Sequence, residues 1–355
     1  MLTLFLYCLL LGCGLQEPGP IGGTDGLEPP PGGTPGPTPT APPPPVPPVL
    51  GDGPFPNAPA DQTWSTSHDA EWSLSPVSHA RYEADNGSHL GIWGDAQYVS
   101  MLDIPSAPWG AASGRAVSIK LPANMPAGNI SAWVTQHRSA GSLVGPLSFA
   151  PSLSDGSIYV GLWLRHRGSG GRPYTPLGRF TRWQESNVVQ KWIYFTSPGV
   201  PDSLAIAHAM VGLINADASD DTRRWMTQYY VPQFHNIRGS SGCLTTGHAA
   251  GTPLSNDWIK DEQWHLVEFL LLPNSFDAGR QPQANGVLRM WLDGRLVVEK
   301  RNVIHYCSSQ AGDDGRVKWS MSSVSLEPIY GGGTNPVPYD LFLDYGRMKI
   351  MYRRR

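Results

Sequence analysis

The stretches WHLVEFLLL (264–272), VLRMWLDG (287–294) and RLVVEKRNV (295–303) decide the fold class of this chain. All three are short and rich in apolar residues, and in the second one apolar residues alternate with polar or aromatic ones, which is the period of a β-strand. Asp293-Gly294 joins the last two stretches and is typical of a tight hairpin turn. The sequence therefore predicts adjacent antiparallel strands in the C-terminal part of the chain.

Similar strand-like segments, separated by turn signals, recur from about residue 61 to residue 355. They are AVSIK (116–120), SIYVGLWLRHR (157–167), GRFTRWQ (178–184), VVQKWIYFTS (188–197), LAIAHAMVGLI (204–214), RRWMTQYYV (223–231), VKWSMSSVSL (317–326) and LFLDYGRMKIMY (341–352). Length alone would allow two domains. No second linker interrupts residues 61–355, so we expect one all-β domain of two packed sheets or a barrel.

The composition favours an exported β-protein. The chain has 355 residues, with 40 Gly, 35 Pro and 13 Trp, and only 15% of its residues are charged, against about a quarter in an average protein. Such a composition is unlike a helical cytosolic enzyme or a disordered acidic chain. The net charge of −3 provides no basic field, so no nucleic-acid partner is expected.

The N-terminus, MLTLFLYCLLLGC, resembles a bacterial lipoprotein signal, although no Lys or Arg precedes its apolar run. The run is too short to span a bilayer and has the length of a signal-peptide core. The resemblance implies a signal peptide at 1–12 and a lipid anchor at Cys13, which would attach an exported protein to a membrane, in the periplasm or at the cell surface. An ordinary cleaved secretory signal is the alternative.

Residues 13–60 are rich in Pro and Gly and contain PPPPVPPV (42–49). They offer little apolar surface to bury, so we expect a disordered, extended linker between the anchor and the domain at 61–355. Two cysteines remain beyond the anchor, Cys243 and Cys307. In an oxidising compartment they favour a disulfide, with two buried free thiols as the alternative.

The strand pair around residue 285 also resembles a known family. A Trp opens one strand, and an Asn-Gly leads into a strand that ends in W-x-D-G. Here these residues are Trp264, Asn285, Gly286, Trp291, Asp293 and Gly294. The pattern is similar to concanavalin A-like jelly rolls of the heparin lyase and glucuronan or alginate lyase type. The ending PIYGGGTNPVPYDLFLDYGRMKI (328–350) resembles bacterial secreted proteins with this fold. The resemblance implies a two-sheet antiparallel jelly-roll sandwich.

The catalytic motifs of these families are incomplete in this chain. Arg165 and Arg167 match the Arg-x-Arg motif of alginate lyases in form, but Ile304-His305 lacks the Gln of their Gln-Ile-His motif. The Glu-x-Asp-x-x-Glu strand of the related glucanases is absent. A retaining glycosidase needs two facing carboxylates about 5 Å apart, and no strand offers them. The sequence therefore disfavours an ordinary hydrolase.

Alternation along several strands gathers aromatic and cationic residues on one face of each. If these faces share one sheet, they form a trough for an acidic polysaccharide, because rings stack on sugars and Arg pairs with carboxylates. The expected binding residues are Trp163, Arg165, Arg167, Gln190, Trp192, Tyr194, Arg223, Trp225, Arg289 and Trp291. Cross-strand Trp–Arg pairing on a solvated sheet, or a protein-docking surface, would explain the same pattern.

Cleavage by β-elimination would need a base that removes the proton next to the uronate carboxylate. The candidates for this base are Tyr194, Tyr229 and His235, whereas His166 falls on an apolar face and is interpreted as a core residue. Asp344 is a candidate ligand for a structural Ca²⁺, or it satisfies a turn or an Arg. No other cofactor is expected.

The sequence thus predicts an envelope lipoprotein whose jelly roll binds polysaccharide. A subunit that docks on a membrane protein complex, or a polysaccharide lyase, are the alternatives.

Overall fold

The computed structural model describes fourteen segments of the chain. They are residues 53–75, 81–84, 92–93, 98–125, 128–129, 147–148, 154–174, 189–196, 208–214, 224–230, 248–253, 261–306, 323–331 and 336–354. The chain divides into two units, Met1–Thr40 and Ala41–Arg355, and all the described residues belong to the second unit.

These segments form eighteen β-strands and no helix. The strands are β1 (Trp64–Ala70), β2 (Trp72–Ser75), β3 (Arg81–Ala84), β4 (Ile92–Trp93), β5 (Val99–Pro105), β6 (Ser113–Leu121), β7 (Gly128–Asn129), β8 (Leu147–Ser148), β9 (Ser154–Gly168), β10 (Val189–Thr196), β11 (His208–Ile214), β12 (Arg224–Tyr230), β13 (His248–Pro253), β14 (Trp264–Leu272), β15 (Gly286–Leu292), β16 (Arg295–Val303), β17 (Ser323–Gly331) and β18 (Leu341–Arg354). Accordingly, nothing in the described part of the chain is a helix long and apolar enough to cross a bilayer.

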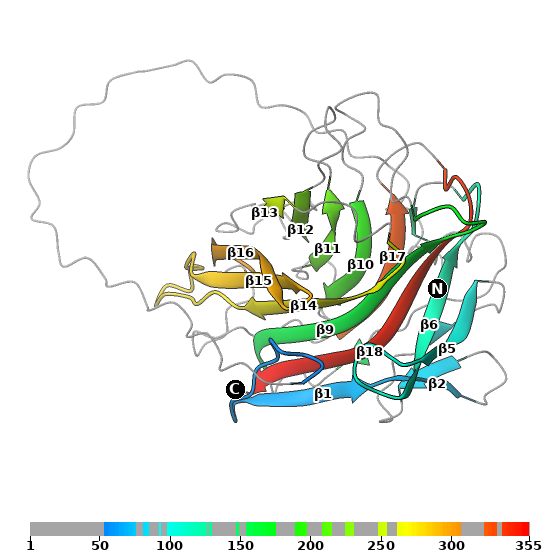
Figure 1. Cartoon of the computed structure of the whole chain (residues 1–355). Helices are drawn as coiled ribbons and strands as arrows, with labels where there is room; N and C mark the ends of the chain where they lie inside the picture. The colour runs from blue at the N-terminus through cyan, green and yellow to red at the C-terminus, as the bar shows by residue number, and fades with distance from the viewer. Residues whose placement is uncertain are drawn as a thin grey trace, which may run out of the picture. The chain divides into compact units, whose positions relative to one another are not determined.

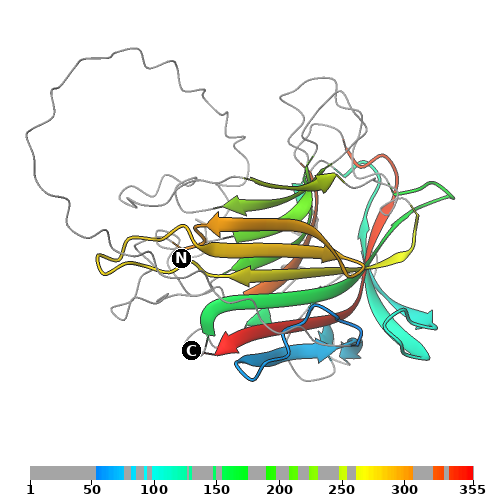
Figure 2. The same ribbon diagram turned by 60° about the vertical axis from the view of Figure 1, so that its left-hand side comes forward.

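Two sheets account for most of the described strands (Figure 1). The large sheet has eight strands in the order β16-β15-β14-β9-β18-β6-β5, with β1 also paired to β18. The second sheet has seven in the order β13-β12-β11-β10-β17-β7, with β8 also paired to β17. Strands β2, β3 and β4 form a small third sheet. In both views β12 and β13 lie beside β16, where the two main sheets meet (Figure 2).

All the described pairings are antiparallel, so the predicted all-β, two-sheet antiparallel jelly-roll sandwich is confirmed. Strand β14 has the bounds that the sequence predicts, and Asp293-Gly294 forms the hairpin turn with φ angles of 50° and 75°. These positive values explain why a residue tolerant of left-handed backbone and a glycine stand there. Strands β1 to β5, β7, β8 and β13 have no counterpart among the predicted strands, and the strand predicted at 178–184 lies outside the described residues.

The main core lies on one face of the large sheet, which we call the inner face. Alternate residues of β9 and β14 are fully buried there, as predicted from the alternation. They include Ile158, Val160, Leu162, Leu164, Val267, Phe269 and Leu271. The opposite, outer face carries Tyr159, Gly161, Trp163 and Arg165 on β9.

Residues 53–60 lie on this outer face and are here called the strap. Phe55 is 2% exposed, and it occupies the space above Gly161, where a Cβ atom would lie 2.4 Å from the ring. The strap and the outer face share an apolar cluster that includes Ala58, Tyr159 and Leu270. Residues 53–60, which read as linker in the sequence, thus pack on the sheet.

Candidate functional site

The residues expected to line one trough lie on two different sheets. Trp163, Arg165 and Arg167 belong to β9 and Arg289 and Trp291 to β15 of the large sheet. The strands β10 and β12, which carry the other described candidates, belong to the second sheet. The prediction of a single continuous trough is therefore wrong.

Part of the outer face is covered by the strap and is not exposed to solvent. Trp291 is 5% exposed and packs in the apolar cluster beneath the strap. Arg289 is paired with Glu299 of the neighbouring strand, with 2.9 Å between Nε and Oε1. Neither residue is placed to take up a ligand, since one is covered and the other is neutralised by its cross-strand partner.

A buried carboxylate, Glu268, fixes the strap to the sheet. Its Oε1 accepts hydrogen bonds from the Asn57 backbone N–H (2.9 Å) and the Tyr159 hydroxyl (2.7 Å). Its Oε2 accepts one from Asn57 Nδ2 at 2.7 Å. Burial raises the pKa of Glu268 above its ordinary value, although these three bonds act in the opposite direction. Glu268 is fully buried and accepts all three bonds from groups of the fold, so we assign it a structural role.

The β5–β6 connection covers the middle of the outer face with Trp109. The Trp109 ring centroid lies 6.2 Å from that of Trp163 and 5.7 Å from that of Trp264. Glu71 accepts a hydrogen bond from the Trp109 indole N–H and another from the Arg115 backbone N–H. Trp163 is consequently half-buried between the strap cluster and the Trp109 cluster.

Beyond Trp109 the outer face carries Arg165 and Arg167, which we call the arginine pair. Both donate through Nε to Oδ2 of Asp344, at 2.8 and 2.5 Å, and Arg167 also reaches Oδ1 at 3.0 Å. Asp344 is fully buried, whereas the arginine side chains are 21% and 27% exposed. Strand register explains the contact, because Asp344 lies opposite Arg165 on the neighbouring strand.

The arginine pair keeps hydrogen-bond donors for a ligand. Arg165 uses only Nε toward the protein, and among the described interactions its two terminal nitrogens have no hydrogen-bond partner. Arg167 uses Nε and one terminal nitrogen, which also contacts Ser118 at 3.3 Å. Since a guanidinium has five N–H donors in a planar fork, Asp344 orients the pair and leaves the outer edge of Arg165 unused.

Aromatic rings and other charges border the arginine pair. The guanidinium carbon of Arg165 lies 4.6 Å from the Trp264 ring centroid, and that of Arg167 lies 4.8 Å from the Phe342 centroid. The hydrogen bond to Asp344 is the main cause that raises the pKa of Arg167, and the nearby carboxylate of Glu262 also contributes. Glu262 therefore offsets part of the positive charge at this site.

The same contacts decide what Asp344 can bind. Both of its oxygens accept hydrogen bonds from the arginine pair, so Asp344 is an arginine partner, which is the alternative that the sequence left open beside a Ca²⁺ ligand. Within the described ranges, moreover, no group of three or more His, Cys, Asp or Glu is arranged to hold a metal ion.

On the second sheet the strand register brings polar residues into one row. Tyr194 pairs with Met210, Met210 with Gln228, and Gln228 with His248, across four neighbouring strands. On its other side Tyr194 pairs with Ser325. Opposite residues on neighbouring strands share a face of a sheet, so these five positions form what we call the Tyr194 row.

The other catalytic candidate on this sheet, Tyr229, occupies the opposite face. It pairs with Ala209, which pairs with Phe195, the residue directly after Tyr194. Successive residues of a strand alternate between faces, so Tyr194 and Tyr229 cannot serve one site.

The remaining candidates of the second sheet divide in the same way. Gln190 and Trp225 both pair with Leu213 and share the face of Tyr229. Trp192 lies at the register shift between Lys191 and Ile193 and has no paired position.

The sequence missed Gln228 and His248 as site candidates. Gln228 stands one residue before Tyr229, on the face of the strand opposite to the one that the alternation singled out. His248 lies in HAAGTP (248–253), which carries no strand signal that alternation would detect.

Several expected sites lie outside the described residues. These are the lipidation site Cys13, the cysteines Cys243 and Cys307, the binding candidate Arg223 and the catalytic candidate His235.

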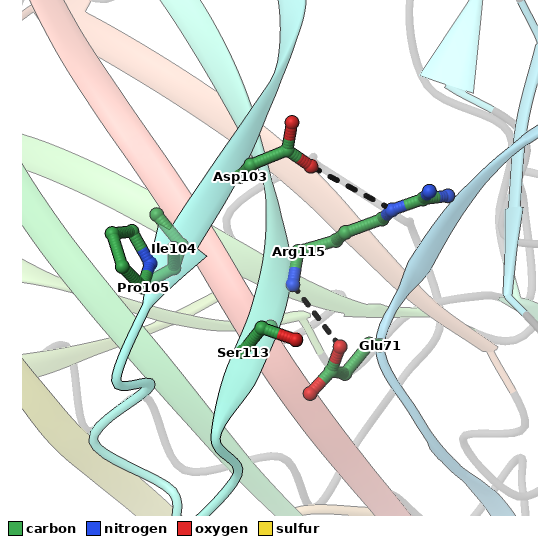
Figure 3. Close-up of a pocket in the computed structure, with 7 residues that line it drawn as sticks. Glu71, Asp103, Ile104, Pro105, Ser113 and Arg115 are labelled. Atoms are coloured by element: carbon green, nitrogen blue, oxygen red, sulfur yellow. Dashed lines mark hydrogen bonds and ion pairs between the residues drawn. The ribbon is translucent and has the colours of Figure 1, made fainter.

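A pocket of about 500 Å³ lies at the end of the β5–β6 hairpin (Figure 3). Its charged residues are Glu71, Asp103 and Arg115, and its apolar wall includes Ile104 and Pro105. Arg115 Nε lies 3.8 Å from Asp103 Oδ1, and the Arg115 backbone donates to Glu71. Both oxygens of Glu71 thus accept hydrogen bonds within the fold, and Arg115 lies within ion-pair distance of Asp103, so the charged groups of this pocket interact with the protein itself.

Comparison with known proteins gives similarity at the level of structure only. No protein-family model matches the sequence, and no curated protein is similar to it. The structure is similar to the marine alginate lyase from Aplysia kurodai, with 14% identity over 81% of this chain and 98% of that chain and a TM-score of 0.46. It is also similar to an endo-β-1,4-glucuronan lyase from the fungus Trichoderma reesei, with 11% identity over 81% and 95% of the two chains and a TM-score of 0.39.

A third similar structure is a β-glucanase from Bacillus licheniformis, with 12% identity over 81% and 93% of the chains and a TM-score of 0.34. These proteins have concanavalin A-like jelly rolls, the class that the hairpin sequence resembles. At such identities the similarity concerns the fold and not the chemistry.

Proposed function

We propose that this domain binds an acidic polysaccharide at the arginine pair. The observation that carries the proposal is that Asp344 fixes both guanidinium groups while the terminal nitrogens of Arg165 stay without a described partner. A fork held in place loses little conformational entropy when a sugar carboxylate binds it in bidentate fashion. The binding energy is then not spent on ordering the side chain.

The aromatic border supports a sugar ligand over a small anion. Trp264 and Phe342 lie against the two guanidinium groups, and both rings are half-buried. A pyranose that places its carboxylate on Arg165 can lay a C–H face against such a ring. A small anion such as phosphate has no C–H face that could stack on these rings.

Affinity electrophoresis of the full chain in gels that contain alginate, polyglucuronate or a neutral glucan tests the proposal. We expect retardation by the acidic polymers and not by the neutral one, and weaker retardation at higher salt. Arg165→Gln should remove most of it without unfolding the domain, because Arg167 keeps its two bonds to Asp344. Arg301→Gln on β16 is the matched control, because Arg301 is 54% exposed and carries the same charge.

A substitution at Glu262 should change the retardation in the opposite direction to Arg165→Gln. Its carboxylate lies close enough to raise the pKa of Arg167, so Glu262→Gln should strengthen retardation by the acidic polymers. Equal retardation of the wild type, Arg165→Gln and Arg301→Gln would contradict the proposed site. Absence of retardation by any glycan would contradict the proposed function.

A second candidate function, polysaccharide lyase, is favoured by the Tyr194 row. The row places a phenol, an amide and an imidazole at paired positions of β10, β12 and β13. Removal of a proton next to a uronate carboxylate needs a base and a donor that stabilises the developing charge. Side chains of these three types are suited to that task.

The lyase activity would appear as an unsaturated product that absorbs in the ultraviolet when the protein is incubated with alginate or polyglucuronate. Tyr194→Phe should abolish the signal, whereas Tyr229→Phe, on the opposite face, should keep it. Equal loss in both variants would contradict the assignment of the base to this row.

We also propose that the chain is an exported lipoprotein anchored to the envelope through Cys13. The N-terminal sequence supports this proposal, and mass spectrometry of the mature N-terminus tests it. A diacylated or triacylated Cys13 is expected, and an unmodified N-terminus would contradict the anchor. Docking on a membrane protein complex remains the competing role, and co-purification after mild detergent extraction, without binding to any glycan, would favour it.

A further inference from the structure

His265 stands between two carboxylates at the start of β14. Its Nδ1 lies 2.7 Å from Oδ2 of Asp293, in the β15–β16 turn. Its Nε2 lies 3.1 and 3.2 Å from the two oxygens of Asp261, which precedes β14. The imidazole is largely buried, with 11% of the side chain exposed. Both ring nitrogens therefore face hydrogen-bond acceptors that cannot donate when ionised.

The number of N–H donors that the two aspartates require determines the protonation state of the His265 ring. A neutral imidazole has one N–H donor, so one of the two carboxylates would face a nitrogen lone pair. Only the imidazolium donates to both aspartates at once. Both contacts also become charge-assisted, which makes them stronger than neutral hydrogen bonds.

Charges on three elements face the ring. Asp261 and Asp293 raise the pKa of His265 by hydrogen bonds and by charge, while burial, the largest single effect, lowers it, and the net direction is upward. On β9 the buried His166 has a pKa lowered to about 3 by burial and by the charge of His265, so it stays neutral. No second cation therefore competes with His265 from that side.

The two carboxylates hold different parts of the chain. The Asp293 carboxylate also accepts a hydrogen bond from the Leu266 backbone N–H at 2.9 Å, and the Asp293 backbone N–H donates to the Leu266 carbonyl at 2.8 Å, so the turn stays in place without His265. Residues 261–263 are held more weakly. Gln263 donates to Asp261 through its backbone N–H and through Nε2, both within the segment, and the Gly168 N–H donates to Glu262 at 3.4 Å. Loss of the proton should therefore loosen residues 261–263 and leave the turn unchanged.

We propose that His265 is a proton-operated clasp, which ties residues 261–263 to the β15–β16 turn as an imidazolium and releases them when it is neutral. The proposal goes beyond polysaccharide binding and does not depend on it. The released segment carries Glu262, whose carboxylate acts on Arg167. The clasp thus lets pH control the position of a charge beside the arginine pair.

Nitrogen-15 NMR of histidine-labelled full chain tests the protonation state, with His265→Gln used to assign the signal. We expect His265 to have both nitrogens protonated over more than half of the molecules at pH 6.5, the ordinary midpoint of a histidine. Asp261→Asn should lower the midpoint, and Asp103→Asn, which removes an exposed carboxylate elsewhere, should not. A neutral tautomer at that pH, or equal midpoints in the two variants, would overturn the proposal.

Hydrogen exchange provides the second readout. Protection of the backbone amides of residues 261–263, corrected for the intrinsic rate, should fall by up to about tenfold per pH unit between the ordinary histidine pKa of 6.5 and the raised midpoint of His265, and should level off above that midpoint. The amide of Asp293 should keep its protection over the same range. Protection of residues 261–263 that does not change across the midpoint, or that changes equally in His265→Gln, would overturn the clasp.

Discussion

The bonds between Asn57 and Glu268 allow the role of the strap to be measured with a single substitution. Asn57→Ala removes the 2.7 Å bond from Nδ2 to Oε2 and leaves the backbone bond to Oε1 in place. A hydrogen bond to a charged acceptor contributes about 1.5–3 kcal/mol. Glu268 is fully buried, so no water replaces the lost donor, and we expect the free energy of unfolding to fall by about 2–3 kcal/mol.

The charge of Glu268 gives this prediction a pH dependence. Its folded-state pKa is raised by burial and held down by the Asn57 bonds, so the variant should have a still higher pKa. A carboxylate with a raised pKa stabilises the fold most below its unfolded pKa, and this contribution is lost as pH rises through the folded pKa. The effect of Asn57→Ala should therefore be larger at neutral pH than near pH 4.5, the ordinary value of the group.

Equilibrium urea unfolding at the two pH values provides the assay. The control is a double-mutant cycle, since Asn57→Ala in the Glu268→Gln background should lose only a neutral bond, about 0.5–1.5 kcal/mol. The same loss in both backgrounds, or a loss below about 0.5 kcal/mol in the wild type, would refute the reasoning that the strap is fastened at this carboxylate.

Three further predictions follow from buried groups. Gly161→Ala places a Cβ 2.4 Å from the Phe55 ring and should lower the unfolding free energy by about 1–3 kcal/mol, with increased proteolysis before residue 61. Asp344→Asn leaves the arginine pair without its carboxylate and should destabilise the domain by up to about 3 kcal/mol in urea unfolding, less than a fully buried pair because the arginines are partly exposed. The buried His166 and His305, with pKa values of about 3 and about 4, stay neutral in the fold but take up protons when unfolded. Stability should therefore fall as pH drops from 6.5 toward 4, by about 1.4 kcal/mol per pH unit for each histidine, and a flat profile there would contradict their burial.

The alternation of residues predicted the inner face of the large sheet and six of its strands, but it missed β1 and β5. Ile158, Val160, Leu162 and Leu164 are core residues, as the period of two requires. The same period separated Trp163 and Arg165 onto the other face, which is also correct. It contains no information on what covers that face, and this is where the prediction of an open trough failed.

The sequence did not reveal that the strap covers the outer face, because the composition of the strap resembles that of a linker. Residues 53–60, GPFPNAPA, have the Pro and Gly content of the linker before them. Phe55 and Asn57 alone mark them as part of the domain, because a large ring and an amide are the groups that fill the space above Gly161 and satisfy Glu268. Both partners are more than a hundred positions away in the sequence, and local patterns do not report such contacts.

The Tyr194 row depends on register, which alternation within single strands does not determine. Shifting β12 by one position would exchange Gln228 for Tyr229 in the row. The bulge between Lys191 and Ile193 changes the register once more within β10. Residue chemistry singled out β10 and β12 but not β13, and only the paired backbones show which residues share a face.

A crystal structure of the full chain with a uronic acid trisaccharide tests the binding site most directly. We expect a sugar carboxylate within hydrogen-bond distance of the terminal nitrogens of Arg165, with a pyranose ring against Trp264. A trisaccharide bound along β10, β12 and β13 with no sugar at Arg165 would contradict the site proposed on the large sheet.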